Sequence, residues 1–513
     1  MATAIGRVMK PHKRSAGSRP ALCVLAAVLG AAGAAHAQST TRIAPMLDTR
    51  LMWTDNVAAD DRDKRSDWVL EVSPGVSMLR DSGRLKGRFN AQLRNFAYAK
   101  ESERNTTYVS LFGRGEFEAV EKFLFLEADA RISRGDTSAL RGRAGGDALN
   151  NDKSNETRIW SIGPRLKFNL GSADGLMRYQ SRHVSGGRNT FGDQQIDRWE
   201  ARLSDPGAFR LLGWQADYER TDTDYQDRRY RALSEEIARA TLFINLSPQF
   251  RLRAIAGYES NDYLSAKGDD GEFFGGGFDW RPTERTRFSA TGEDRVLGRT
   301  YDVLFTHRMP RLAWDFRVGN NVSSSAQALA RGYDDDPLFQ VILNSPGLIT
   351  EYSDPLEREN AARRLYDASY GDPALLSNAY YMQRSAQAKV SFLGVRNMLT
   401  FSVQRNRRSA LSQTGDEGRD DLAGYNNVET RSGTVSYSHR LSGYSTLTAA
   451  YTHSKSEGHG SRSLQTERRS TAIGVATRLG PHTTGSLSVR HQSSDGGSDY
   501  TENAVIGHLG MRF

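Results

Sequence analysis

The stretch RLKGRFNAQLR, residues 84–94, alternates between two kinds of side chain. Leu85, Phe89 and Leu93 share one parity with two small residues, and the other parity holds only basic and amide groups. A helix with 3.6 residues per turn would scatter these charges around its axis, whereas a strand points successive side chains to opposite faces. The stretch therefore predicts a β-strand with one apolar face and one polar face.

The same alternation recurs in segments far along the chain: Val109–Phe117, Leu124–Ile132, Leu252–Tyr258, Val435–Arg440 and Thr471–Arg478. A soluble β-sandwich also alternates in this way, so it is the alternative to consider. A strand that crosses a membrane must pair all its backbone groups with neighbouring strands, and it shows lipid only its apolar face. Three further features favour the membrane barrel over the sandwich.

The first feature is the asymmetry of the connections. Tight turns at 81–83, 171–175, 247–249, 308–310, 441–443 and 480–482 alternate with long polar stretches at 135–155, 221–234, 320–380 and 407–429. This order is typical of an all-β, up-and-down antiparallel transmembrane β-barrel with short periplasmic turns and long external loops. We predict about 22 strands, within a range of roughly 18 to 22. Asp354 as a cap and Pro355 in a first turn predict one short helix in the loop 320–380.

The second and third features are the tryptophans and the end of the chain. All seven tryptophans fall in predicted strands, as in the aromatic girdles of membrane barrels: Trp53, Trp68, Trp160, Trp199, Trp214, Trp280 and Trp314. At the end of the chain, Val505, Gly507, Leu509, Met511 and Phe513 share one parity. A closing strand that ends in Phe resembles the signal that bacterial barrel-assembly machinery recognises. We therefore predict Phe513 as the assembly signal and that machinery as a partner.

The first residues resemble an export signal. Five basic residues (Arg7, Lys10, Lys13, Arg14 and Arg19) precede an apolar run at 21–35, which ends in Ala35-His36-Ala37. We predict a signal peptide at 1–37, cleavage after Ala37, and a barrel at 38–513 in the outer membrane of a Gram-negative cell. A membrane anchor would need a longer apolar run. A lipoprotein would need Cys23 at the end of the run, and this cysteine lies near its start.

Composition and motifs narrow the function classes. Cys23 is the only cysteine, so the mature chain has no disulfide framework and no thiolate. Removing the five basic residues of the signal from the 69 Lys and Arg leaves 64, against 61 Asp and Glu, and nucleic acid is not an expected partner. No nucleophile–base set, zinc spacing or phosphate-binding loop is present in the sequence. We therefore predict no catalytic residues, no cofactor, no metal site and no enzyme activity.

The predicted polar faces suggest a ligand track inside the barrel. Eight basic residues are expected to point inward: Arg84, Lys86, Arg88, Arg94, Arg251, Arg253, Arg440 and Arg490. A cationic lumen would attract anionic solutes and favour their passage. Glu116, Glu118, Glu127 and Asp129 are expected to point inward as well, with Asp129 opposite Arg114. Pairing between facing charges is therefore the alternative to a ligand track.

The N-terminal quarter resembles a known family. The resembling residues are Pro45–Asn56, Ser73–Val76, Arg104-Asn105 with Tyr108, and Phe123–Ala130. They are similar to those of outer-membrane β-barrels associated with the PEP-CTERM/exosortase and exopolysaccharide systems, and the remainder resembles this family only in layout. The resemblance implies a role in a surface polysaccharide or protein-sorting pathway, and it implies no catalytic or ligand residues.

These observations lead to a porin-like barrel associated with exopolysaccharide export or with the PEP-CTERM/exosortase system. The expected partners are outer-membrane lipid, lipopolysaccharide, an anionic polysaccharide and export-complex proteins. The alternative is a non-conducting docking scaffold with a plugged lumen. A TonB-dependent receptor would have a suitable strand count, but we expect a globular plug domain ahead of its strands, and here strands are predicted from near Pro45.

Overall fold

The computed structural model describes residues 41–136, 140, 154–186, 193–227, 229–264, 268–330, 337–344, 348, 358–359, 362, 377–412, 420–461, 463–497 and 499–513. The predicted signal peptide lies outside these residues. Every structural statement below concerns the described part of the chain.

The described chain forms one antiparallel sheet of 22 strands. The first eleven are β1 Thr41–Thr54, β2 Asp67–Ser82, β3 Leu85–Tyr98, β4 Thr106–Val120, β5 Leu124–Asp136, β6 Ser154–Leu170, β7 Ala173–Gly186, β8 Gln194–Phe209, β9 Leu212–Tyr225, β10 Leu233–Ser247 and β11 Phe250–Asn261. The others are β12 Asp269–Thr283, β13 Thr286–Arg295, β14 Gly298–Arg308, β15 Leu312–Ser324, β16 Tyr380–Leu393, β17 Asn397–Ala410, β18 Tyr425–Arg440, β19 Ser445–Gly460, β20 Ser463–Gly480, β21 Thr483–Gly496 and β22 Tyr500–Arg512.

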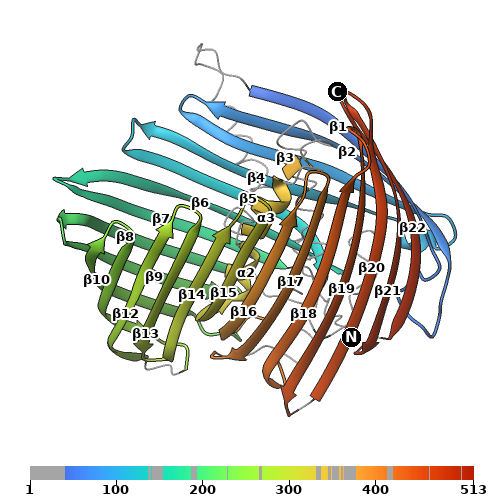
Figure 1. Cartoon of the computed structure of the whole chain (residues 1–513). Helices are drawn as coiled ribbons and strands as arrows, with labels where there is room; N and C mark the ends of the chain where they lie inside the picture. The colour runs from blue at the N-terminus through green and yellow to red at the C-terminus, as the bar shows by residue number, and fades with distance from the viewer. Residues whose placement is uncertain are drawn as a thin grey trace, which may run out of the picture. The chain divides into compact units, whose positions relative to one another are not determined.

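The sheet closes on itself. Each strand pairs with the next along the chain, and β22 pairs with β1 from Met46↔Arg512 to Thr54↔Ala504. At the seam the Phe513 amide donates a hydrogen bond to the Pro45 carbonyl at 3.0 Å. Figure 1 shows the red C-terminal strands beside the blue N-terminal ones. The prediction of an up-and-down barrel of about 22 strands is confirmed.

Besides a few isolated helical residues, three short helices lie in the connections of the described part of the chain: η2 Ser102–Arg104, α2 Ser325–Ala330 and α3 Pro337–Leu343. Helical segments are therefore present in the loop where one was predicted. Of the particular helix expected after Pro355, Arg358, Glu359 and Ala362 are described and helical, and its remainder lies outside the described residues. No helix in the described part of the chain has the length and apolar composition to cross a membrane.

The two ends of the barrel differ in their connections. The end that holds Thr41 and Phe513 has only tight turns, at 83–84, 121–123, 171–172, 210–211, 248–249, 284–285, 309–311, 394–396, 441–444 and 481–482. Gly83 takes a φ of 73° in one of these turns, a conformation that glycine adopts without a Cβ clash. The long connections lie at the opposite end, so the first end is periplasmic and the second is external.

The external connections are shorter than the sequence predicted. The loop expected at 221–234 is reduced to 226–232, because β9 continues to Tyr225 and β10 starts at Leu233. Thr221 and Thr223 in this extension are buried, so inner side chains there pack beneath the external connections instead of facing solvent. The polar composition of these residues suggested a solvated loop, but they extend β9 and their inner side chains are buried.

The two faces of the strands follow the predicted parity. On β3 and β4 the outward Leu93 and Val109 are exposed to the surroundings, whereas the adjacent inward Arg94 and Tyr108 are buried. All seven tryptophans lie in strands, and Trp68, Trp160, Trp199 and Trp280 are exposed on the outside. The apolar face is therefore the outer one, as lipid requires.

The register of β3 provides a test of these faces. Phe89 shares the outward parity of Leu93, while the Asn90 side chain lies inside, 3.8 Å from the Met46 sulfur. Phe89→Arg should cost about 2–4 kcal/mol if the position is near the bilayer midplane, and Asn90→Arg should cost much less. Urea unfolding from lipid vesicles measures both values. Equal costs at these adjacent positions would contradict the assigned faces.

Candidate functional site: the barrel lumen

The inner face of the barrel is sealed at its external end. Inner side chains near that end are almost fully buried on strands all around the barrel: Thr54, Val69, Tyr98, Ile159, Val184, Ile196, Thr223, Glu259, Phe273, Ser323, Tyr381, Thr430, Ser456, Thr466 and Glu502. Toward the periplasmic end many inner side chains are half-buried, whereas inner residues of β15–β17 such as Asp315, Lys389 and Thr400 are buried there too. The described inner face is thus more accessible toward the periplasmic side than at the external end.

Much of the seal comes from the described residues of the long segment 325–379 between β15 and β16. Its helix α2 inserts Ala326 into a buried cluster with Ile159, Val184 and Ile196, which are inner residues of β6, β7 and β8. Phe339 and Ile342 of α3 are also buried. Figure 1 draws both helices within the ring of strands. The described residues of this segment therefore lie within the barrel.

An ion pair ties the middle of this segment to the wall. The Arg88 guanidinium, on the inner face of β3, lies 2.7 Å from a carboxylate oxygen of Glu359. Both side chains are mostly withdrawn from solvent. Water screens the attraction between these two charges less than it would screen an exposed pair.

The C-terminal end of the segment joins several parts of the barrel. The Asn378 carbonyl accepts a hydrogen bond from Tyr225 of β9 at 2.7 Å, and its side-chain oxygen accepts one from Gln194 of β8 at 3.1 Å. The Asn378 amide donates to Asp420, in the connection 411–424, at 3.2 Å. Asn378 thus links the β8–β9 wall to a loop that belongs to the β17–β18 wall.

A second external connection completes the seal. Leu140, between β5 and β6, packs with Ala379, Tyr381, Leu422 and Val428 in one buried cluster. The Leu140 carbonyl accepts a hydrogen bond from the Thr466 hydroxyl of β20. Residues from three external connections therefore meet over the lumen. These contacts have large sequence separations, and no local pattern predicted them.

Below the seal, the wall from β4 to β13 carries facing opposite charges. Arg165 contacts Glu116 and lies 3.1 Å from Glu127, and Arg178 lies 3.1 Å from Glu127 and 3.8 Å from Glu200. Arg202 continues the series to Asp217 at 2.7 Å. Further along the wall, Arg239 pairs with Glu293 and Arg295 with Glu259. We call the inner face of β4–β13 the ion-pair wall.

The eight predicted basic residues do not form one site. They lie on β3 and its turn, on β11, on β18 and on β21. Five of them contact carboxylates: Arg88 with Glu359, Arg94 with Glu71, Arg251 and Arg253 with Asp279, and Arg490 with Glu502. Lys86 lies opposite Asp81 and Glu116 in the register, while Arg84 and Arg440 lie at the periplasmic ends of β3 and β18. A ligand role for these residues stays a prediction.

The strand register confirms one predicted position, since Arg114 of β4 lies directly opposite Asp129 of β5. The sequence reasoning missed Arg165 and Arg178, although both occupy inward positions that the alternation could have revealed. It also missed Ala326 and Asn378, for which no local signal exists.

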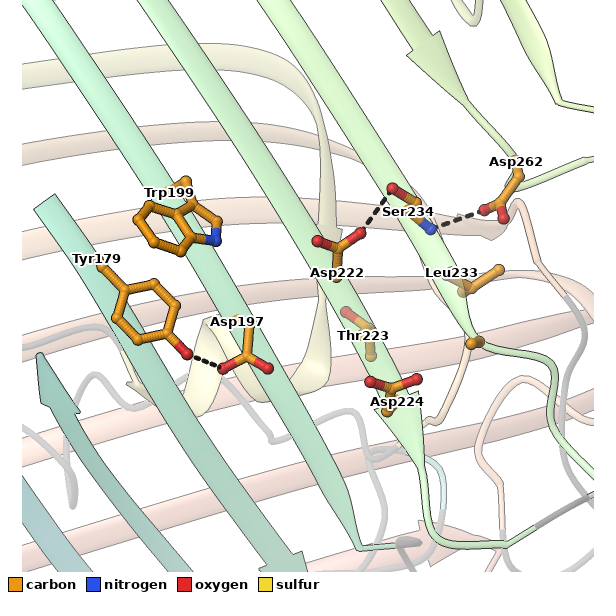
Figure 2. A pocket seen from close by; sticks show the side chains of 10 residues that line it. Tyr179, Asp197, Trp199, Asp222, Thr223, Asp224, Leu233, Ser234 and Asp262 are labelled. Carbon is orange, nitrogen blue, oxygen red and sulfur yellow. Dashed lines mark hydrogen bonds between the residues drawn. The ribbon is translucent and has the colours of Figure 1, made fainter.

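Two concave regions lie on the part of the wall formed by β7–β15. One, of about 460 Å³, faces the lumen and is lined by groups of the ion-pair wall such as Arg202, Asp217, Arg239 and Glu293. The other, also about 460 Å³, lies at the external rim beside the exposed Trp199. Figure 2 shows that its carboxylates have neighbours: Asp197 accepts from Tyr179, and Asp222 and Asp262 accept from Ser234.

The side chains in these two regions can bind polar groups and can neutralise one another's charges. In the described part of the chain, no group of three or more His, Cys, Asp or Glu side chains is placed to hold a metal ion. In the acidic rim pocket of Figure 2, Asp197, Asp222 and Asp262 already accept hydrogen bonds from protein groups. The lumen remains the candidate functional site.

Comparisons with known proteins show which solved structures share this architecture. No protein-family model and no curated protein matches the sequence. Among solved structures, the siderophore receptor PirA from Acinetobacter baumannii is 7% identical, with 93% of this chain and 81% of that chain covered and a TM-score of 0.50. The FrpB iron transporter from Neisseria meningitidis is 11% identical, with 92% and 81% covered and a TM-score of 0.49. A mutant of the ferric enterobactin receptor PfeA from Pseudomonas aeruginosa is 9% identical, with 93% and 81% covered and a TM-score of 0.44.

At these identities the likeness concerns the fold alone. Together with the closed sheet and its apolar outer face, it shows that the chain is a transmembrane β-barrel of the Gram-negative outer-membrane type.

Proposed function

We propose that this protein is a gated outer-membrane conduit through which an extracellular polysaccharide leaves the periplasm. The observation that carries the proposal is the external seal, because inserted loop residues such as Ala326 cover the inner side chains of the wall there. A barrel of about 22 strands is too wide for its own side chains to fill, so its lumen is either water-filled or plugged. Here a polar lumen ends beneath a removable plug.

The plug can move without breaking the barrel. Strands β15 and β16 remain paired up to Ser324↔Tyr380, and the Ser377 amide donates to the Ser325 hydroxyl at 3.0 Å. The two ends of the segment therefore lie side by side. The backbone hydrogen bonds between β15 and β16 do not involve the segment. Displacing the segment breaks the Ala326 cluster, the Arg88–Glu359 pair and the Asn378 hydrogen bonds, while the strand ladder stays intact.

The polysaccharide is proposed on the sequence resemblance to barrels of exopolysaccharide systems. The ligands named for the structural neighbours, siderophores and iron, are not carried over to this chain, because a likeness at 7% identity concerns the fold. The same sealed mouth also supports a second candidate, a docking scaffold whose lumen never opens. The two candidates differ in whether the plug has to move.

A disulfide lock separates the two candidates. Cys23 is the only cysteine and lies in the predicted signal, so paired cysteines can be introduced without a competitor. Ala326→Cys combined with Val184→Cys joins two residues of one buried cluster. In the native host, we expect the oxidised protein to stop the release of extracellular glycan, with glycan accumulating in the periplasm. A membrane-permeant reductant should restore release.

The two single-cysteine variants control for packing, and gel mobility without reductant verifies the disulfide. Undiminished glycan release from cells whose barrels are verified as locked would contradict the conduit. If deletion of the whole protein abolishes release while the lock does not, the docking scaffold is the better account.

A further inference from the structure

The inner wall of the barrel is divided into two chemically different halves. On β18 the inner positions from Thr430 to Ser438 are all Ser or Thr, and on β19 those from Thr446 to Ser456 are Ser or Thr except for one Ala. The adjacent β17, β20 and β21 add further hydroxyls, amides and a few Arg. No inner position of β17–β21 in the described residues is acidic. We call this surface the hydroxyl wall.

The absence of carboxylates from the hydroxyl wall is not a matter of local composition. The same strands carry Glu429, Glu457 and Glu467, and all three have outward parity. Their basic partners, such as Arg405 for Glu429, are on the outer face as well. Acidic groups are thus segregated to the outside on β18–β20, whereas on the ion-pair wall they line the inside.

The hydroxyl wall is accessible from the periplasm. Ser432, Ser436, Thr452, Ser454 and Ser488 along the middle of the strands are half-buried. At the external end inner hydroxyls are fully covered, as at Thr430 (1% exposed) and Ser456 (2% exposed), and Thr400 and Thr446 nearer the periplasmic end are buried as well. The described contacts of Leu140 reach this wall at Val428 and Thr466, near its external limit. The wall therefore runs from the periplasmic end of the lumen to the seal.

Hydroxyl side chains on this wall are close enough to exchange hydrogen bonds with one another. Thr434 and Thr452 lie 3.1 Å apart across the β18–β19 pair, and Thr430 and Ser456 lie 3.3 Å apart. A hydroxyl both donates and accepts, and its proton rotates to suit the partner. Such a surface can replace its internal hydrogen bonds with those of a sugar ring, and short side chains leave room for the ring.

We propose that the hydroxyl wall is the surface along which a polyhydroxylated glycan chain binds and slides. This inference rests on the proposed function, whose conduit it deepens by naming the contacting wall. Many interchangeable hydroxyl contacts give weak binding at any one position, which permits movement along the wall. The ion-pair wall is unsuited to this role, because its donors and acceptors are already engaged with one another.

The test uses the full-length protein in an amine-oxide detergent, since detergents with sugar heads would compete. The probe is maltoheptaose, a neutral glycan, and its binding is measured by saturation-transfer NMR. The variant combines Ser432→Ala, Ser436→Ala, Thr452→Val and Ser454→Ala. If about two of these four hydroxyls contact the glycan at one time, the variant should bind maltoheptaose about tenfold more weakly.

The matched control removes the same number of hydroxyls from inner positions elsewhere: Ser110→Ala, Ser133→Ala, Ser204→Ala and Thr291→Val. This control should bind maltoheptaose as the unaltered protein does, and heat-dependent gel mobility confirms that both proteins are folded. Equal weakening in the two variants, or no binding to the unaltered protein, would overturn the proposal. A second outcome would also overturn it: the protein binds an acidic oligogalacturonate but not maltoheptaose, and this binding survives removal of the hydroxyls. The arginines would then be the contacting groups.

This measurement does not depend on export. Loss of binding with intact glycan release would reject the hydroxyl wall and leave the conduit standing, whereas the disulfide lock tests the conduit by itself.

Discussion

Deleting residues 326–376 should turn a nearly silent protein into a large, steadily open pore. The intact barrel should show few conductance steps in planar bilayers, because Ala326, Phe339, Ile342 and Glu359 of this segment are buried. Without the segment, the Arg88–Glu359 pair and the α2 cluster are lost together. The resulting conductance should exceed that of porins with about 16–18 strands, since the diameter of a barrel grows with strand number.

The two ends of the segment are close enough for this deletion to leave the barrel strands unchanged. Ser325 and Ser377 are joined by a hydrogen bond of 3.0 Å, so two glycines can bridge them without disturbing β15 or β16. A suitable control shortens another external connection, 226–232, which lies outside the described contacts of the plug. A protein that is silent both with and without residues 326–376 would contradict the conduit and favour the docking scaffold.

The open variant would also test the predicted selectivity. An anion preference was expected from Arg84, Lys86, Arg88, Arg251 and Arg253, and replacing these residues by Gln should weaken it. The contacts of Arg251 and Arg253 with Asp279 offset part of their charge. We therefore expect the preference to be small.

Removing Phe513 should abolish most assembly of the protein into the outer membrane, with accumulation and degradation in the periplasm. Phe513 is 73% exposed at the periplasmic end of the seam, where assembly machinery can reach it. Its structural contribution is small, since its amide makes one seam hydrogen bond, to Pro45, worth about 0.5–1.5 kcal/mol. A large loss of assembly would therefore reflect recognition and not stability.

Two measurements separate recognition from stability. Fractionation of cells with heat-dependent gel mobility reports assembly in vivo, and refolding of the purified chain into detergent reports the intrinsic fold. We expect the deletion to fail in the first and to behave normally in the second, while Phe513→Trp should pass both. Normal outer-membrane yield after the deletion would show that the terminal Phe is incidental.

The architecture of the wall could be predicted from the sequence because its determinants are local. A strand places alternate side chains on opposite faces, and lipid tolerates only apolar groups on one of them, so each segment carries its own orientation. The alternation in residues 84–94 was sufficient to place Leu93 outside and Arg94 inside. Short turns then set the register of neighbouring strands, as in the pairing of Arg114 with Asp129.

The closure of the lumen was decided by the tertiary structure alone. Glu359 meets Arg88, Asn378 meets Gln194 and Asp420, and Leu140 meets Thr466, and in each case the partners come from different connections or strands. The segment 325–379 has no period that lipid enforces, so its composition is compatible with a loop that stands outside and with one that folds inward. The choice between them depends on buried contacts such as those of Ala326, which exist only once the distant strands β6–β8 have closed into the wall.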